Sequence, residues 1–362
     1  MRNKPYKVAL VGCGAVSEMI YAPLLARLVQ ERLVEIVAIV DPNSDRTEKI
    51  KKVFMTSRSY QNISSLFDED FPDLAIIASP HKFHADQTVA CLDRGIHVLC
   101  EKPMATTSTD CDRMTDAAAK VGCVLAVGHF RRFFPSCELI KEILDAGLLG
   151  PIESFRFLEG ETFSWPAQSG AFFNRTESGG GVLIDSGAHT LDLLLWWMGE
   201  VAEVEYHDDA LGGIEANCRM RLKMVNGAEG IVQLSRDWPL PNRYVIECKK
   251  GWLAYTCDVV DRLEWGLCKS AYGLNAHIQQ ILASGRDARL LGASVRSFTE
   301  SFMAQLRNVV ASISGSESPR VPGTEAKKCV TLIEQCYQRR QLLDMPWLSE
   351  KEYKHARKLA NV

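Results

Sequence analysis

The chain has 362 residues, of which 46% are hydrophobic and 24% charged, and its formal net charge is −3. This composition is typical of a globular protein that is too long for one ordinary core, so about two domains are expected. The small negative charge argues against a nucleic-acid or membrane-surface partner. We find no apolar leader at the start and no run long enough to span a bilayer, so we expect a cytoplasmic protein.

The twelve cysteines are scattered along the chain, and several lie inside apolar runs, as Cys91, Cys123 and Cys218 do. No CxxC pair or Cys/His cluster has the spacing of metal ligands. We therefore expect reduced thiols and no metal site.

The first predicted strand, residues 7–11, runs directly into the sequence Gly12-Cys13-Gly14-Ala15-Val16-Ser17. A helix is predicted over residues 17–31, so these glycines stand between a buried strand and a helix, as in a dinucleotide-binding fingerprint. Gly12 would make the tight turn and Gly14 would let a pyrophosphate approach the backbone at the helix N-terminus. Ala15 and Val16 are further candidate cofactor contacts. A glycine turn without a ligand is the alternative interpretation.

The second predicted strand, residues 34–40, ends in Asp41. An acid at this position bonds the adenosine ribose hydroxyls and repels a 2′-phosphate, which favours NAD over NADP. Asp41 lies further from the glycines than the usual spacing of about 20 residues, which indicates a long intervening helix. Arg46 could still hold a phosphate. Asp41 also fits the N-cap of a helix predicted over residues 43–52, and the two roles are compatible.

A third buried strand, residues 73–78, is followed by a polar turn and a helix predicted over residues 85–94. The turn has the sequence Ser79-Pro80-His81-Lys82-Phe83-His84. Two histidines at this spacing suggest a metal, but no third ligand is near, so a capping or cofactor-edge role is favoured. Ser79, Pro80, His81 and His84 are accordingly candidate cofactor-binding residues.

The apolar run 96–100 predicts a strand that ends in Glu101-Lys102-Pro103. Ligands of parallel α/β sheets bind beyond the carboxyl ends of the strands, and Pro103 restricts the turn that presents Lys102. A surface turn with a solvated Glu–Lys pair is the alternative.

A helix at 108–121 and a strand at 124–127 follow, and His129 comes at the same edge. The βα alternation over residues 7–133 predicts a parallel, doubly wound sheet.

After a helix at 137–146 and a break at 147–151, the pattern changes to strands, several of which alternate. They are predicted over residues 152–159, 215–224, 228–235, 242–248 and 252–257. This part should be an α+β domain with a mostly antiparallel sheet. No periodicity is evident over 258–292, and helices at 294–314 and 325–343 should cover the nucleotide domain or a sheet edge.

A helix within this second part is preceded by Gly179-Gly180-Gly181 and carries Asp185, His189 and Asp192. Asp185 and His189 are four residues apart, so they project from one helix face, and Asp192 lies near the same stripe. The opposite face carries Leu193, Leu194, Trp196 and Trp197. A histidine beside a carboxylate is suited to general base catalysis. A buried His–Asp pair with a structural role is the alternative.

Together these motifs resemble the glucose–fructose oxidoreductase, inositol dehydrogenase and MocA (GFO/IDH/MocA) family. The resemblance rests on the glycine loop, the run Ser79–His84, the turn Cys100-Glu101-Lys102-Pro103-Met104-Ala105, and the glycine-rich run through Asp192. It implies a Rossmann domain over residues 1–133, an open-faced sheet domain for substrate and oligomerisation over 134–343, and a tail over 344–362. It also implies a homodimer or homotetramer formed through that sheet.

The resemblance further implies that Lys102, Asp185 and His189 match the catalytic positions of the family. His81 stands where the family often has asparagine, and many members have another residue at His129. The implied reaction is hydride transfer between NAD(P) and a secondary alcohol of a sugar, cyclitol or nucleotide-sugar.

In that reaction His189 would be the acid/base, and Lys102 would stabilise the alkoxide. Asp185 would orient His189 or bond a substrate hydroxyl, and Glu101 would anchor Lys102 or the cofactor ribose. Candidates for the substrate wall are Phe172, Phe173, Asn174 and Arg175.

Two other functions stay open: a non-catalytic protein that senses sugars or dinucleotides, and an NAD-dependent glycoside hydrolase. Lys102 and His189 are both present, which argues against loss of catalysis. No motif indicates the substrate, the oxidised carbon or the direction of reaction.

Overall fold

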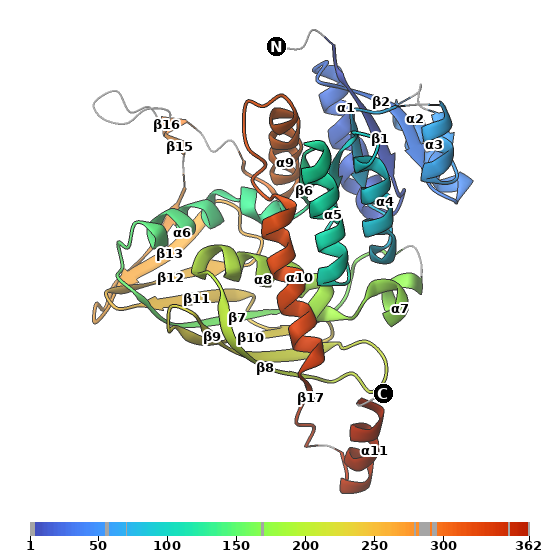
Figure 1. The fold of residues 1–362 in the computed structure, drawn as a ribbon. Helices are drawn as coiled ribbons and strands as arrows, with labels where there is room; N and C mark the ends of the chain where they lie inside the picture. The colour runs from blue at the N-terminus through green and yellow to red at the C-terminus, as the bar shows by residue number, and fades with distance from the viewer. Residues whose placement is uncertain are drawn as a thin grey trace. The chain divides into compact units, whose positions relative to one another are not determined.

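The computed structural model describes residues 4–54, 58–69, 71–167, 170–278, 280–281, 290–291, 295–346 and 348–360. The chain forms two compact units, each built from three segments. Unit 1 comprises Met1–His129, Trp165–Gly179 and Phe302–Val330, and unit 2 comprises Phe130–Ser164, Gly180–Ser301 and Thr331–Val362. Figure 1 shows the chain as a ribbon and labels those helices and strands for which there is room, with the names used below.

Unit 1 is organised around a sheet whose six described strands are all parallel, in the order β3-β2-β1-β4-β5-β6. The strands are β1 Tyr6–Val11, β2 Val34–Val40, β3 Arg58–Tyr60, β4 Leu74–Ile77, β5 His97–Cys100 and β6 Leu125–Val127. The central strands are short apolar runs that are buried on both faces, as β4 is over its whole length. The predicted parallel, doubly wound sheet is confirmed. The edge strand β3 was not predicted.

The helices of unit 1 alternate with these strands. They are α1 Ala22–Gln30, α2 Ser44–Phe54, α3 Ile63–Glu69, α4 His84–Leu92, α5 Ser108–Val121 and the short α7 Arg175–Ser178, with 3₁₀ turns η2 His81–Phe83 and η4 Gly170–Phe173. Helix α5 has the predicted bounds because both ends carry a cap. The Thr107 hydroxyl accepts from the Asp110 N–H at its start, and Gly122 adopts a left-handed conformation after its end.

The predicted first helix, 17–31, differs in the structure. The π-helical turn η1, Ser17–Tyr21, comes first, and α1 begins at Ala22. Pro23 has no N–H to donate within the turn, and the Ala22 N–H donates to the Ser17 carbonyl, one residue further back than in an α-helix. Tyr21, the last residue of this wider turn, is fully buried.

Two long helices near the end of the chain pass from one unit to the other: α9 Phe298–Ile313 and α10 Gly323–Gln338. In unit 1, the Val127 N–H donates to the Val321 carbonyl at 3.0 Å, so the chain before α10 runs along strand β6. The predicted helix 325–343 was too long, because β17 Arg340–Leu342 pairs with a strand of unit 2. Helix α11 Glu350–Ala360 lies in the predicted tail.

Unit 2 contains a sheet with nine described strands in the order β14-β13-β12-β11-β7-β10-β9-β8-β17. They are β7 Ile152–Gly160, β8 Val201–Asp208, β9 Asn217–Met224, β10 Glu229–Ser235, β11 Arg243–Cys248, β12 Gly251–Thr256, β13 Arg262–Leu267, β14 Gly273–His277 and β17. The β7–β10 and β8–β17 pairs are parallel and the others antiparallel. The mostly antiparallel sheet is therefore confirmed.

Sequence periodicity missed β8, β13, β14 and β17. Strands β13 and β14 fall in the stretch 258–292, where no periodicity is evident and the sequence leaves the structure open, and so does the small pair β15 Gln280–Ile281 and β16 Leu290–Leu291. The rest of that stretch lies partly outside the described residues.

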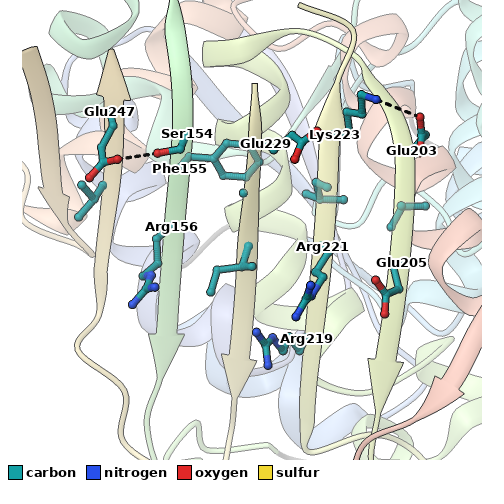
Figure 2. Close-up of a pocket in the computed structure, with 15 residues that line it drawn as sticks. Ser154, Phe155, Arg156, Glu203, Glu205, Arg219, Arg221, Lys223, Glu229 and Glu247 are labelled. Carbon is teal, nitrogen blue, oxygen red and sulfur yellow. Dashed lines mark hydrogen bonds and ion pairs between the residues drawn. The ribbon is translucent and has the colours of Figure 1, made fainter. Parts of the chain in front are cut away.

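Two helices of unit 2, α6 Pro135–Asp145 and α8 Val182–Met198, contact the sheet and each other, with η3 Phe130–Phe133 before α6. Strand β9 alternates buried and outward residues along its length, so one face of the sheet is apolar and the other polar. The polar face forms a shallow pocket across β11, β7, β10, β9 and β8, shown in Figure 2. Among the described helices, none is long and apolar enough to cross a membrane.

Candidate active site

The carboxyl ends of five parallel strands in unit 1 lie in one row. Val11 of β1 is paired with Val40 and with Ile77, Ile77 with Cys100, and Cys100 with Val127. Each predicted cofactor-binding segment begins one or two residues after this row. The sheet thus brings the glycine loop, Asp41, Ser79, Glu101 and His129 to one edge, which is where ligands of such sheets bind.

The two glycines of the loop have different roles. Gly12 has φ +91° and a Cβ there would lie 2.5 Å from the Ala78 carbonyl oxygen, so the turn requires glycine. A Cβ on Gly14 would meet no described atom within 4 Å. Packing within the described chain therefore does not explain Gly14.

Ser17, in place of the third glycine, is fully buried and its hydroxyl donates to the Gly12 carbonyl at 2.6 Å. This bond holds the loop against the start of the helix. Ala15 is buried beside it, and Val16 is partly exposed.

Asp41 is buried and ties two loops together. Its Oδ2 accepts from the Cys13 N–H and its Oδ1 from the Asn43 N–H, both at 2.8 Å. The cap of α2 is Asn43, whose side chain accepts from the N–H groups of Asp45 and Arg46. The N-cap interpretation of Asp41 was therefore wrong. Burial and the nearby Asp41 carboxylate raise the pKa of the Cys13 thiol to about 12, which keeps that thiol protonated.

The turn after β4 is held by hydrogen bonds of its own residues. His84 is fully buried, with Nδ1 2.9 Å from the Pro103 carbonyl and Nε2 2.8 Å from that of Ser79. It therefore joins the turns after β4 and β5. His81 Nδ1 lies 2.9 Å from the Ser178 carbonyl, and the Ser79 hydroxyl donates to Gln87. Pro80 is exposed.

Glu101 is buried, with only 8% of its surface exposed. Its Oε1 accepts from the Tyr21 hydroxyl at 2.5 Å and its Oε2 from the Lys102 N–H at 3.1 Å. Burial raises the pKa of Glu101, opposed by these bonds and by the charge of Lys102. Lys102 itself is partly exposed, and His129 is buried at the end of β6. The solvated Glu–Lys turn was therefore the wrong alternative for Glu101.

The candidate substrate-wall residues belong to unit 1. Asn174 caps α7 by accepting from the Thr176 N–H at 3.0 Å, and Phe172 and Phe173 contact each other edge to face. Phe173 and Arg175 are exposed. Lys82 pairs with Glu177 at 3.3 Å, so this segment rests on the turn after β4.

In unit 2, the glycines that precede α8 pack closely around the buried residue Glu215. Glu215 accepts through Oε1 from the N–H groups of Gly181 and Leu183 and from the Tyr337 hydroxyl. A Cβ on Gly180 would collide with Tyr337, and one on Gly181 with the Glu215 backbone. A carboxylate that binds the first N–H groups of α8 stabilises the start of this helix. Sequence reasoning missed Glu215 because it lies in a loop without a motif.

Helix α8 carries the predicted chemical centre. Asp185 forms a hydrogen bond and an ion pair with Arg236, with Oδ2 3.5 Å from Nη2. His189 is buried, and its ring lies edge to face on Phe130 with centroids 4.9 Å apart. Arg236, which follows β10 directly, also lies over the Phe163 ring. Its position after a predicted strand end was the one signal that could have indicated it.

Asp192 has a structural role. Its two carboxylate oxygens accept from Arg132 Nε at 2.8 Å and Nη2 at 2.7 Å, and both side chains are almost fully buried. The neighbouring Thr190 hydroxyl donates to Glu159, which also binds Arg131 and the Tyr244 hydroxyl. Burial raises the pKa of Glu159, but Arg131 and these bonds outweigh it and hold that pKa below its usual value. These buried pairs join α8 to the sheet and to η3.

No group of three or more His, Cys, Asp or Glu side chains suited to a metal ion occurs among the described residues.

A parallel sheet with a glycine loop at its carboxyl edge, followed along the chain by a mixed sheet and a helix that carries Asp185 and His189, defines the class of two-unit α/β proteins with a nucleotide-binding type of sheet. Residues 6–129 match the model of the oxidoreductase family with an NAD-binding Rossmann fold, and residues 137–254 match the GFO/IDH/MocA C-terminal domain. The chain belongs to the GFO/IDH/MocA family.

Among curated relatives, the chain is 29% identical to D-glucoside 3-dehydrogenase of Escherichia coli over 60% of this chain and 62% of that protein. It is 22% identical to myo-inositol 2-dehydrogenase of Thermotoga maritima over 90% and 93% of the two chains. The match with D-glucoside 3-dehydrogenase therefore spans less than two thirds of the length of that enzyme.

Solved structures share the fold. The WlbA dehydrogenase of Bordetella pertussis, in complex with NADH and UDP-GlcNAcA, has a TM-score of 0.77 at 21% identity and covers 94% of this chain and 96% of its own. Levoglucosan dehydrogenase with NADH and levoglucosan has a TM-score of 0.80 at 19% identity, covering 93% and 97%.

Proposed function

We propose that this protein is an NAD(P)-dependent dehydrogenase acting on a secondary alcohol or ketone of a sugar, cyclitol or nucleotide-sugar. The observation that carries the proposal is the single row of strand ends that aligns the glycine loop, Asp41 and the Glu101-Lys102 turn. Curated relatives named as sugar and cyclitol dehydrogenases support the substrate class.

The residues present fit a dinucleotide. Gly14 offers its backbone without a Cβ, in a place that no described atom fills. Asp41 stands at the end of β2 with its carboxylate held in place by two N–H groups. A carboxylate there disfavours a 2′-phosphate, so NAD is the preferred cofactor in this proposal. When bound, the nicotinamide supplies or accepts the hydride.

The chain's own residues would handle the proton and the charge. His189 is assigned as the acid/base that takes the proton from the substrate hydroxyl. Lys102 is assigned as the cation that stabilises the developing alkoxide. Asp185, paired with Arg236, would bind a neighbouring substrate hydroxyl or orient His189. Phe173 and Arg175, both exposed, stay candidate substrate contacts.

Self-association through the polar face of the nine-stranded sheet is part of the proposal. In Figure 2 acidic residues on β8 stand beside basic residues on β9, and Lys223 pairs with Glu203. Rows of opposite charge suit a second copy of the same face. The molar mass by light scattering should exceed that of one chain, and Arg221→Glu should lower it.

The direct test is nicotinamide absorbance and tryptophan fluorescence with NAD, NADH, NADP and NADPH, against a panel of polyols, cyclitols and nucleotide-sugars. We expect NAD(H) to bind more tightly than NADP(H) and one substrate class to turn over. Binding without any turnover would favour the sensing protein, and cleavage of a glycosidic bond would favour the hydrolase. A complete lack of dinucleotide binding would overturn the proposal.

A further inference from the structure

The turn that carries Lys102 is attached to a buried hydrogen-bond chain in unit 1. One oxygen of the Glu101 carboxylate accepts a hydrogen bond from the Tyr21 hydroxyl, and the other accepts one from the Lys102 N–H. The second bond goes to the backbone of Lys102 itself, so it links the Glu101 carboxylate to the turn.

Tyr21 is fixed from several sides. It is fully buried, its ring lies edge to face on Phe302 with centroids 6.1 Å apart, and Gln305 Nε2 lies 3.4 Å from its hydroxyl oxygen. It ends the π-helical turn η1, whose first residue, Ser17, binds the Gly12 carbonyl. One turn of the chain therefore contacts both the phosphate-type loop and Glu101. π-turns of this kind are frequent at functional sites.

The space around the Glu101 carboxylate is limited by the chain at Gly128. A Cβ on Gly128 would lie 2.9 Å from Glu101 Oε2, so a larger residue at position 128 would displace the Glu101 carboxylate. Taking a carboxylate out of water is costly, and an apolar side chain would fill the same space without that cost. Burial correspondingly raises the pKa of Glu101. The carboxylate thus has a use that an apolar residue could not serve, which is to accept two hydrogen bonds at once.

We infer that Tyr21 is a positioning residue, which acts through Glu101 to fix the turn that presents Lys102. This inference rests on the proposed function only in taking Lys102 as the catalytic cation. It differs from a role in core packing, because the phenyl ring alone would fill the space between Phe302 and Glu101, whereas only the hydroxyl reaches the carboxylate.

The variant Tyr21→Phe removes the hydroxyl and keeps the ring, so it tests the role of the hydroxyl alone. Since a displacement of about 1 Å at a catalytic group costs on the order of 10²-fold in rate, we expect kcat to fall by about 10-fold to 100-fold. The dissociation constant for NADH and the KM for substrate should change little. Tyr60→Phe is the matched control, because the Tyr60 hydroxyl also donates to a glutamate, Glu69, at 3.3 Å. Tyr60 contacts the Asp41 N–H through its backbone carbonyl, at 3.0 Å, and the substitution keeps that carbonyl. It should keep the wild-type kcat.

A second readout does not need turnover. Lysines are labelled by reductive methylation with ¹³C-formaldehyde, and the Lys102 NMR signal is assigned with Lys102→Arg. Tyr21→Phe should move this signal, and Tyr60→Phe should not. Glu101→Gln should move it as well, and this variant serves if Tyr21→Phe does not fold.

The outcomes separate the two proposals. A Lys102 signal that responds to Tyr21→Phe in a protein that turns over nothing would uphold the positioning role and overturn the dehydrogenase. Normal turnover with an unchanged Lys102 signal and kcat in both Tyr21→Phe and Glu101→Gln would overturn the positioning role alone. No turnover and an unmoved signal would overturn both.

Discussion

The Asp185 carboxylate faces the Arg236 guanidinium, with Oδ2 3.5 Å from Nη2, and the Arg236 side chain is only 9% exposed. A buried cation thus stands beside the helix face that carries His189. Replacing it by the neutral Arg236→Met would leave a partly buried carboxylate without this partner. We expect kcat/KM to fall by about 10-fold to 100-fold, because Asp185 loses its orientation.

Steady-state kinetics check this prediction. Arg243→Met is the matched control, because Arg243 forms a bidentate pair with Glu264 at 2.6 and 2.8 Å elsewhere in unit 2. An Arg236→Met enzyme with wild-type kcat/KM would show that this ion pair serves only the fold.

The two proposed catalytic side chains should be separable from dinucleotide binding. Lys102→Met and His189→Asn should each lower kcat by about 10²–10⁴-fold, the contribution of a positioned acid–base group. The dissociation constant for NADH, measured by fluorescence, should stay within a few-fold of the wild-type value, because the glycine loop and Asp41 are unchanged. Wild-type kcat in both variants would rule out these roles.

The two glycines of the loop should respond differently to alanine. At Gly12 a methyl group would meet the Ala78 carbonyl, and φ is +91°, so Gly12→Ala should destabilise the protein by about 1–3 kcal/mol. Gly14→Ala meets no described atom and should keep the wild-type unfolding midpoint while weakening dinucleotide binding. Thermal unfolding without ligand and fluorescence titration with NADH measure the two effects. Equal unfolding midpoints for both variants would contradict this difference.

The Arg132–Asp192 pair should stabilise the folded protein. Arg132→Met removes the guanidinium that both Asp192 oxygens accept from, in a place where both side chains are buried. Breaking a buried pair in this way costs about 3–5 kcal/mol. Denaturant unfolding of Arg132→Met and of the double variant Arg132→Met/Asp192→Leu tests this. The double variant should recover part of the loss, and a double variant as unstable as the single one would speak against an uncompensated charge as the cause.

His84 should make the fold sensitive to mild acid. Burial lowers the pKa of His84, while its bonds to the Pro103 and Ser79 carbonyls partly oppose this. Below the unfolded-state pKa of about 6.5 the unfolded chain binds the proton more readily, so the free energy of unfolding falls as the pH drops from there. One such group contributes a slope of at most about 1.4 kcal/mol per pH unit.

Unfolding in denaturant between neutral pH and pH 5 measures this slope, and His84→Gln should reduce it. Burial also lowers the pKa of His97, so His97→Gln is the comparison variant that should remove a separate part of it. An unchanged slope in His84→Gln would mean that His84 does not titrate in this range.

The sequence by itself determined the features that depend on neighbours along the chain. Short apolar runs that alternate with amphipathic helices predicted the parallel sheet, because strands buried on both faces need continuous apolar residues. The same runs located the polar turns at their carboxyl ends, from Gly12 to Lys102. Helix α5 has the predicted bounds, and its ends are set locally, by the caps Thr107 and Gly122.

Other features depend on contacts between distant residues, and only the tertiary structure decided them. Arg236 and Asp185 are 51 residues apart and Tyr21 and Glu101 are 80 apart, so no periodicity or spacing relates them. Strand β17 replaced the end of a predicted helix because β8 offers it a partner. A hydrogen bond between distant residues exists only once the fold has brought them together. The motifs of the site could therefore be predicted from the sequence, whereas the hydrogen bonds that hold its residues in place could not.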